Sequence, residues 1–171
     1  MAFTSALLQK LGIDVKHEVM GEDGMASWTA TYGYRQPSSI ITKAPHLLKH
    51  EDFAVLHQVR EPLAAIASIQ TFGPMSWVFA SNREPHIRDG DSLLLRAMTY
   101  WCYWNQMAEA RARLTYQVEQ LDPDNAFGLG MAVNARPHRS VSWHDLVAEN
   151  TELTAQIRAI SARYGYGATD N

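Results

Sequence analysis

The chain has 171 residues, a length typical of one domain, and its hydrophobic fraction of 46% and aromatic fraction of 10% exclude global disorder. Its formal charge of −3 at pH 7 gives no broad basic field, so a dedicated nucleic-acid-binding domain is not expected. The single cysteine, Cys102, excludes an internal disulfide and a Cys-rich zinc site and is typical of a reducing cytoplasm; no apolar window reaches the about 18 residues of a membrane span.

The first part of the chain predicts a helix, a short strand and a loop. Apolar residues at helical spacing run from Phe3 to Leu11, and Gly12 is expected to end this helix in a left-handed conformation. Ile13 to Val15 is short and β-prone, and a glycine-bearing loop follows it. Trp28 to Tyr34 is expected to be helical.

Two apolar runs in the middle of the chain predict strands buried on both faces, Ser39 to Lys43 and Phe53 to Val59. Each run leads to a Lys or Arg that is followed two residues later by a proline. Pro62 suits the first turn of a helix, and the alanine-rich run after it continues with helical spacing. A strand, an Arg-Glu-Pro exit and a helix make half of a β-α-β unit.

The remaining elements continue this alternation. Asp91 to Arg113 is the longest helical candidate, and Leu114 to Val118 is expected to form a third strand. Ser142 is a suitable N-cap for a helix from the next residue, and Leu153 to Tyr164 predicts a terminal helix that Gly165 ends. Because no repeat or linker divides the chain, we expect a single α/β domain over residues 1–171, with helices on the faces of a sheet.

Residues at the carboxyl ends of the predicted strands are the first candidates for a ligand site, because open α/β sheets bind their ligands there. These residues are Lys43 and Arg60, and Ser68 lies eight positions after Arg60 in the following helix. An arginine and a serine so placed can converge on one phosphate. The alternative is structural, with Arg60 at the sheet edge and Ser68 packed in its helix, and spacing alone favours that alternative.

The segment LHQVREPLAAIASIQTF resembles the 3′-phosphate-binding segment of sulfotransferases, in which a strand ends in Arg-x-Pro and a serine lies eight residues beyond the arginine. Further blocks resemble the family in the same order: LGIDVKHEVMGEDGMASW, ITKAPHLL, YWCYWNQMAEA, LTYQVEQL and SVSWHDL…ISARYGYG. The resemblance covers nearly the whole chain. It implies the three-layer α/β sandwich of the P-loop type, with a parallel sheet, that sulfotransferases share.

The resemblance also implies a reaction, the transfer of a sulfuryl group from 3′-phosphoadenosine-5′-phosphosulfate to a hydroxyl or amine. Arg60 and Ser68 would hold the 3′-phosphate, and Lys43 would stabilise charge on the leaving phosphate. The late basic loop with Arg136 and Arg139 would close the nucleotide pocket. For Lys43, an exposed strand-end lysine is the alternative, and for the basic loop, a solvated surface segment.

Three residues are candidates for the general base that takes the acceptor's proton: His17, Glu18 and His46. Ordinary loop hydrogen bonding is the alternative for the first two. A zinc-protease helix motif is absent because Gly21 stands where a second histidine is required. His46 and His50 lack an evident third ligand, so we expect no metal.

One departure from the family pattern concerns the 5′-phosphosulfate. Sulfotransferases open with a strand and a Gly/Ser/Thr-rich loop, whereas this sequence begins within the helix that follows them. We therefore expect an N-terminally truncated chain, or a degenerate and non-catalytic relative that binds a nucleotide or a protein partner. An incomplete sheet would expose strand edges, so we also expect self-association into a homo-oligomer.

The acceptor, a small molecule or a glycan, is not specified by the sequence. Its specificity would come from loops at Gly21 to Tyr34 and Phe72 to Asp91. The aromatic run from Tyr100 to Trp104 is expected to be core and not a base-stacking surface.

Overall fold

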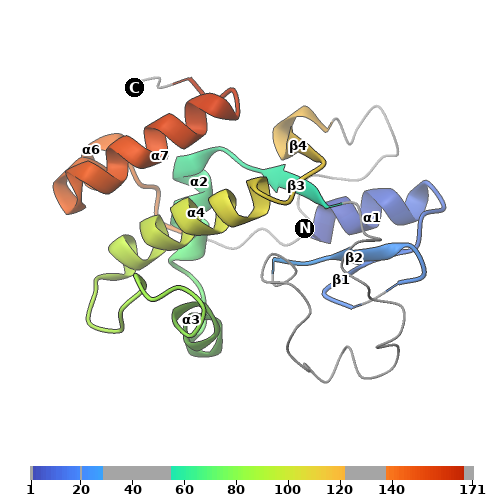
Figure 1. The fold of residues 1–171 in the computed structure, drawn as a ribbon, viewed down its shortest axis with the longest axis horizontal. Helices are drawn as coiled ribbons and strands as arrows, with labels where there is room; N and C mark the ends of the chain where they lie inside the picture. The colour runs from blue at the N-terminus through green and yellow to red at the C-terminus, as the bar shows by residue number, and fades with distance from the viewer. Residues whose placement is uncertain (1, 20, 29–54, 122–137, 168–171) are drawn as a thin grey trace. The chain divides into compact units, whose positions relative to one another are not determined.

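The computed structural model describes residues 2–19, 21–28, 55–121 and 138–167 (Figure 1). It divides into two compact units, one of Met1–Val55 with Gln120–Ala135 and one of Leu56–Glu119 with Arg136–Asn171. Across the described ranges the secondary structure comprises six α-helices and two small parallel sheets of two strands each. The chain is therefore an α/β protein, as its alternating pattern predicts.

The described part of the first unit is a helix followed by two short strands. Helix α1 (Ala2–Lys10) precedes β1 (Val15–His17), which pairs in parallel with β2 (Gly24–Ala26). The hydroxyl of Ser5 donates a hydrogen bond of 2.7 Å to the carbonyl of Val15, which ties α1 to β1. The predicted helix end is confirmed, because Gly12 has a φ of 79°, in the left-handed region that favours glycine.

Two elements predicted for this unit lie outside the described residues. The strand over residues 39–43 falls wholly there, and of the helix over residues 28–34 only Trp28 is described, in a bend.

The second unit contains two of the predicted strands, β3 (Leu56–Val59) and β4 (Leu114–Gln117), and they pair in parallel as expected. The prediction that β3 is buried on both faces is wrong. His57 and Val59 are buried, whereas Leu56 on the other face is 53% exposed. The reason is that helix α4 packs on one face of β3, the face that carries His57, as the hydrogen bond from His57 to Asn105 of that helix shows.

The described part of this unit also contains five helices: α2 (Pro62–Ile69), α3 (Pro74–Ser81), α4 (Leu93–Glu109), α6 (Trp143–Glu149) and α7 (Thr151–Arg163). Helix α4 is central, since α2, α6 and α7 all pack against it (Figure 1). Three of the four aromatic residues from Tyr100 to Trp104 form core, as expected: Tyr100, Trp101 and Trp104 are buried, and the Trp104 ring stacks on Tyr100 with centroids 4.4 Å apart. The expectation is wrong for Tyr103, which is half-buried, lines a cavity and stacks on His86 with ring centroids 4.6 Å apart.

Local signals explain where these helices begin. Pro62 occupies the first turn of α2, and Ser142 caps α6 through a capping box with Asp145, so both predicted starts are confirmed. Helix α4 begins after its N-cap Ser92 and ends at Glu109. It is therefore shorter at both ends than the predicted 91–113.

Helix α3 corrects the prediction of a loop over residues 72–91. Pro74 occupies its first turn, and the helix buries Trp77 and Ala80. This burial offsets the weak intrinsic helical preference of so short a segment.

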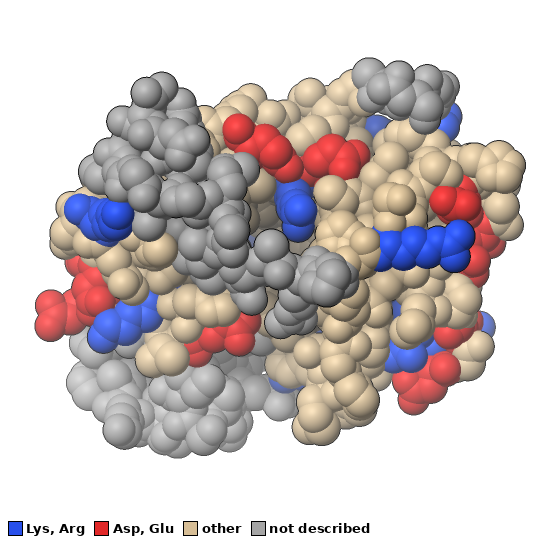
Figure 2. Space-filling view, turned by 180° about the vertical axis from the view of Figure 1, so that it is seen from behind, with Lys and Arg blue, Asp and Glu red and all other residues tan. Residues whose placement is uncertain are grey.

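None of the described helices is by itself long and apolar enough to cross a membrane, although α2 and α3, bent by 111° at their junction, meet the criteria of length and composition as a pair. On the face shown in Figure 2, positive and negative side chains of the described residues are interspersed.

Candidate functional site

The candidate site lies at the carboxyl ends of β3 and β4, where the chain turns from β3 into α2. We call residues Arg60, Glu61 and Pro62 the Arg60 turn. Arg60 directly follows β3 and is exposed, and Pro62 is the first residue of α2. Because the two strands are parallel, β4 ends at the same edge of the sheet, where Glu119 follows in a short 3₁₀ turn (Val118–Gln120).

The N-terminus of α2 already holds a carboxylate. Glu61 is its N-cap, and its two carboxylate oxygens accept hydrogen bonds from the amides of Leu63 (3.1 Å) and Ala64 (2.7 Å). Free amides at a helix N-terminus attract anions. Here the side chain of Glu61 takes that place, so an external anion at this edge would depend mainly on the guanidinium of Arg60.

A second carboxylate holds the backbone of the Arg60 turn. The amide of Glu61 donates to Glu119 Oε1 at 2.8 Å, and the phenol of Tyr166 donates to Glu119 Oε2 at 2.6 Å. Burial is the main cause that raises the pKa of the Tyr166 phenol. The hydrogen bond from this phenol to Glu119 and the negative charges of Glu119 and Glu61 raise the pKa further, and the positive charge of Arg60 lowers it by a smaller amount. The phenol therefore stays protonated and remains a donor at physiological pH.

Ser68 lies on α2, about two turns beyond the Arg60 turn, and is half-buried. Its carbonyl accepts hydrogen bonds from the amide and the hydroxyl of Thr71. A cavity of about 290 Å³ elsewhere in this unit is lined by residues of α4, the α3–α4 loop and the start of α7, and neither Arg60 nor Ser68 is among them. A shared cavity for Arg60 and Ser68 therefore stays a prediction.

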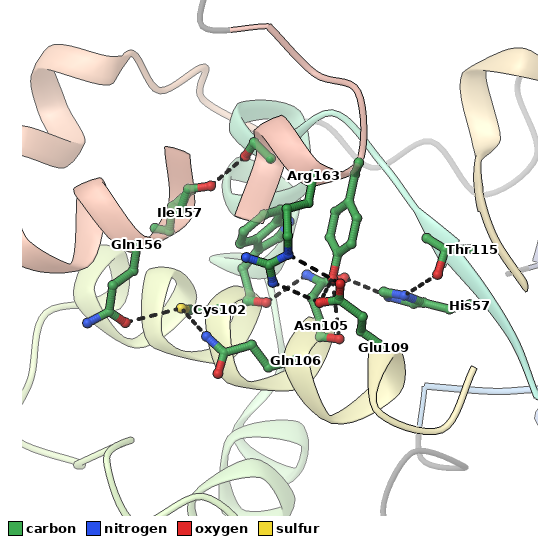
Figure 3. Close-up of polar contacts among 12 residues, drawn as sticks. His57, Cys102, Asn105, Gln106, Glu109, Thr115, Gln156, Ile157 and Arg163 are labelled. Atoms are coloured by element: carbon green, nitrogen blue, oxygen red, sulfur yellow. Dashed lines mark hydrogen bonds and ion pairs between the residues drawn. The ribbon is translucent and has the colours of Figure 1, made fainter. Parts of the chain in front are cut away.

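A polar cluster that is buried at His57 and partly exposed at its Glu109–Arg163 end joins both strands to α4 and α7 (Figure 3). His57, on β3, is 5% exposed, and its Nε2 lies 2.9 Å from Asn105 Oδ1 on α4. The amide nitrogen of Asn105 donates to the carbonyl of Trp101, so its oxygen must accept from His57. His57 Nδ1 lies 3.4 Å from the hydroxyl of Thr115 on β4, which can donate to it. Burial lowers the pKa of His57, and this effect outweighs the influence of Asn105 and Glu109.

The other half of this cluster is an ion pair between α4 and α7. Arg163 donates two hydrogen bonds to Glu109, at 3.3 and 2.8 Å, and the phenol of Tyr164 donates to the same carboxylate at 3.1 Å. The Arg163 contact, chiefly, holds the pKa of Glu109 below its usual value. The ring of Tyr164 also packs edge-on against His57, so the cluster is continuous from the strand to the end of α7.

The remaining predicted site residues are not brought to this edge by any described contact. His17 and Glu18 belong to the first unit, at the end of β1, where both side chains are partly exposed and His17 Nε2 lies 4.0 Å from Glu18 Oε1. Arg139 is exposed ahead of α6. Lys43, His46 and Arg136 lie outside the described residues.

Sequence reasoning missed Glu119 and Tyr166 as parts of the site, although both lie in blocks that carry the family resemblance. His57 had one local signal, a titratable residue within a run that was predicted to be a buried strand. Within the described ranges, no group of three or more His, Cys, Asp or Glu side chains is arranged to hold a metal ion.

No protein-family model, no curated protein and no solved structure matches this chain.

Proposed function

We propose that this protein is sulfotransferase-like, with a three-layer α/β fold, and that it binds 3′-phosphoadenosine-5′-phosphosulfate at the Arg60 turn. The observation that supports the proposal is an exposed arginine at the carboxyl end of a parallel strand, followed at once by a helix with proline in its first turn. This edge is where parallel α/β sheets bind ligands. The same segment carries the resemblance to the 3′-phosphate-binding segment of sulfotransferases.

In this proposal Arg60 and Ser68 hold the 3′-phosphate. The planar guanidinium of Arg60 donates two parallel hydrogen bonds to phosphate oxygens, and the hydroxyl of Ser68 donates a third. Arg136 and Arg139 close the pocket over the same phosphate. The carboxylate of Glu61 occupies the amides at the start of α2, so these side chains carry the binding.

The proposed chemistry is a displacement at sulfur. The acceptor oxygen or nitrogen forms a bond to sulfur while the bond between sulfur and the bridging phosphate oxygen breaks, which leaves adenosine 3′,5′-bisphosphate. A base among His17, Glu18 and His46 takes the acceptor's proton, and Lys43 stabilises the charge that develops on the leaving phosphate.

The test is calorimetric titration of adenosine 3′,5′-bisphosphate against the wild type and Arg60→Lys, with a thermal melt of each. Lysine keeps the positive charge but cannot donate the two parallel hydrogen bonds of a guanidinium. Because one charge-assisted hydrogen bond contributes about 1.5–3 kcal/mol, we expect the affinity for the bisphosphate to fall about tenfold or more. The matched control is Arg113→Lys, an exposed arginine at the amino-terminal end of β4 and hence at the opposite edge of the sheet. It should leave the affinity unchanged.

A second variant should act in the opposite direction. Glu61→Gln removes a negative charge beside the phosphate site, so we expect binding to strengthen by about two- to fivefold, while α2 loses part of its cap and the melting temperature falls. A wild type that does not bind the bisphosphate, or an Arg60→Lys variant that melts lower and binds like the wild type, would overturn the nucleotide site.

A second candidate function is nucleotide binding without catalysis, by a degenerate relative of the sulfotransferases. The N-cap Glu61 favours it, because its carboxylate already accepts hydrogen bonds from the amides at the start of α2 and leaves them unable to bind the ligand. A transfer assay with 3′-phosphoadenosine-5′-phosphosulfate and p-nitrophenol separates the two. Sulfated product that depends on Arg60 supports the enzyme, and bisphosphate binding without product supports the non-catalytic relative.

A further inference from the structure

The peptide bond that joins Arg60 to Glu61 is held in place from two distant parts of the chain. Its N–H donates to Glu119 Oε1, and Glu119 Oε2 accepts from the phenol of Tyr166. One carboxylate thus links the exit of β3, the end of β4 and the segment after α7. Both of its oxygens are occupied by donors, so its geometry is defined from both sides.

Tyr166 reaches Glu119 because of how α7 ends. The amide of Gly165 donates to Ala162 and that of Tyr166 to Ser161, the pair of bonds of a Schellman motif, and Gly165 has a φ of 84°. The side chain of Gln117 then donates to the carbonyl of Tyr164 at 2.6 Å, which fastens this turn to β4. The placement of the Tyr166 phenol is therefore set by the backbone of the turn.

Phosphate binding at this edge depends strongly on the position of Arg60. At a helix with free N-terminal amides, those amides would share in binding the phosphate. The carboxylate of Glu61 already accepts hydrogen bonds from the amides of Leu63 and Ala64. A phosphate at this edge would therefore be bound mainly by the parallel N–H donors of the Arg60 guanidinium. A bidentate contact needs the plane of the guanidinium to be aligned with two oxygens, and small displacements weaken it. The alignment begins at the backbone of Arg60, which the Glu119 hydrogen bond restrains.

We propose that Glu119 and Tyr166 are positioning residues for the phosphate site, which act by fixing the backbone of the Arg60 turn. This inference rests on the proposed function of Arg60. It assigns the segment after α7 a role in nucleotide binding through a contact that does not itself touch the nucleotide.

The experiment compares two variants that carry the same charge. Glu119→Gln keeps an oxygen that accepts from the Glu61 amide, whereas Glu119→Ala loses it, and both remove the negative charge. We expect Glu119→Ala to bind adenosine 3′,5′-bisphosphate about three- to tenfold more weakly than Glu119→Gln. Equal affinities would overturn the proposal.

Tyr166→Phe supplies an independent measurement. Loss of the phenol oxygen should speed amide hydrogen exchange at Glu61 by about fivefold or more and weaken bisphosphate binding about threefold. The control is Tyr164→Phe, which loses its bond to Glu109 but keeps the carbonyl that Gln117 binds. It should lower the melting temperature and change neither Glu61 exchange nor affinity.

The outcomes separate this proposal from the proposed function. Arg60→Lys that weakens binding, together with Tyr166→Phe that leaves binding and Glu61 exchange unchanged, would overturn the positioning role alone. A wild type that does not bind the bisphosphate would overturn both.

Discussion

Replacement of His57 by glutamine should remove a specific dependence of stability on pH. The imidazole is buried and neutral, with Nε2 donating to Asn105, and burial lowers its pKa below the ordinary value of 6.5. Glutamine keeps an N–H donor for Asn105 but does not titrate. It loses the edge-on contact with Tyr164 and the bond with Thr115, which together should cost about 1–2 kcal/mol at pH 8.

The sign of the pH effect follows from the two states. Below pH 6.5 the unfolded chain binds a proton at His57 that the folded protein does not bind, so the free energy of unfolding falls as pH falls. One proton contributes at most about 1.4 kcal/mol per pH unit, until the folded-state imidazole is also protonated. The wild type should therefore lose its advantage over His57→Gln as the pH falls from 8 to 5.5.

The assay is urea unfolding of both proteins at four pH values between 8 and 5.5, a range above that in which most carboxylates titrate. His144→Gln is the control, because His144 is exposed on α6, and its difference from the wild type should stay constant. Stability curves of His57→Gln and the wild type that run parallel over this range would contradict a lowered pKa of His57 in the folded protein.

Three other substitutions or treatments test the packing. Gly165→Ala should lower stability by about 1–2 kcal/mol in urea unfolding, since its φ is 84° and a Cβ would lie 3.0 Å from Gln117 Nε2; an unchanged midpoint would contradict this. Ser92→Ala should cost about 1 kcal/mol by the same assay, because the Ser92 hydroxyl caps α4. Burial raises the pKa of the Cys102 thiol to about 11, so an aromatic disulfide reagent at pH 8 should label it only after unfolding; rapid native labelling would contradict its burial.

Much of the secondary structure of the second unit was predictable because its signals are local. Proline in the first turn of α2, Ser142 ahead of α6 and Gly165 after α7 each act through backbone sterics or a hydrogen bond within a few residues. Such signals survive in any tertiary context. The parallel pairing of β3 and β4 also followed from a strand, a helical crossover and a further strand.

The sequence by itself thus determined the α/β class, the starts of α2 and α6 and the position of Arg60 directly after β3. It placed the first strand at residues 13–15, whereas β1 is Val15–His17, and it did not predict β2 or α3. Tertiary structure decided which side chains meet there. Glu119 binds the Glu61 amide across 58 residues of chain, Tyr166 binds Glu119 across 47, and His57 binds Asn105 across 48. Contacts over such separations depend on how strands and helices pack, and no local pattern encodes them. Packing also made α3 a helix, because burial of Trp77 and Ala80 outweighs the weak helical preference of so short a segment. It left the face of β3 that carries Leu56 exposed, because α4 packs on the face that carries His57.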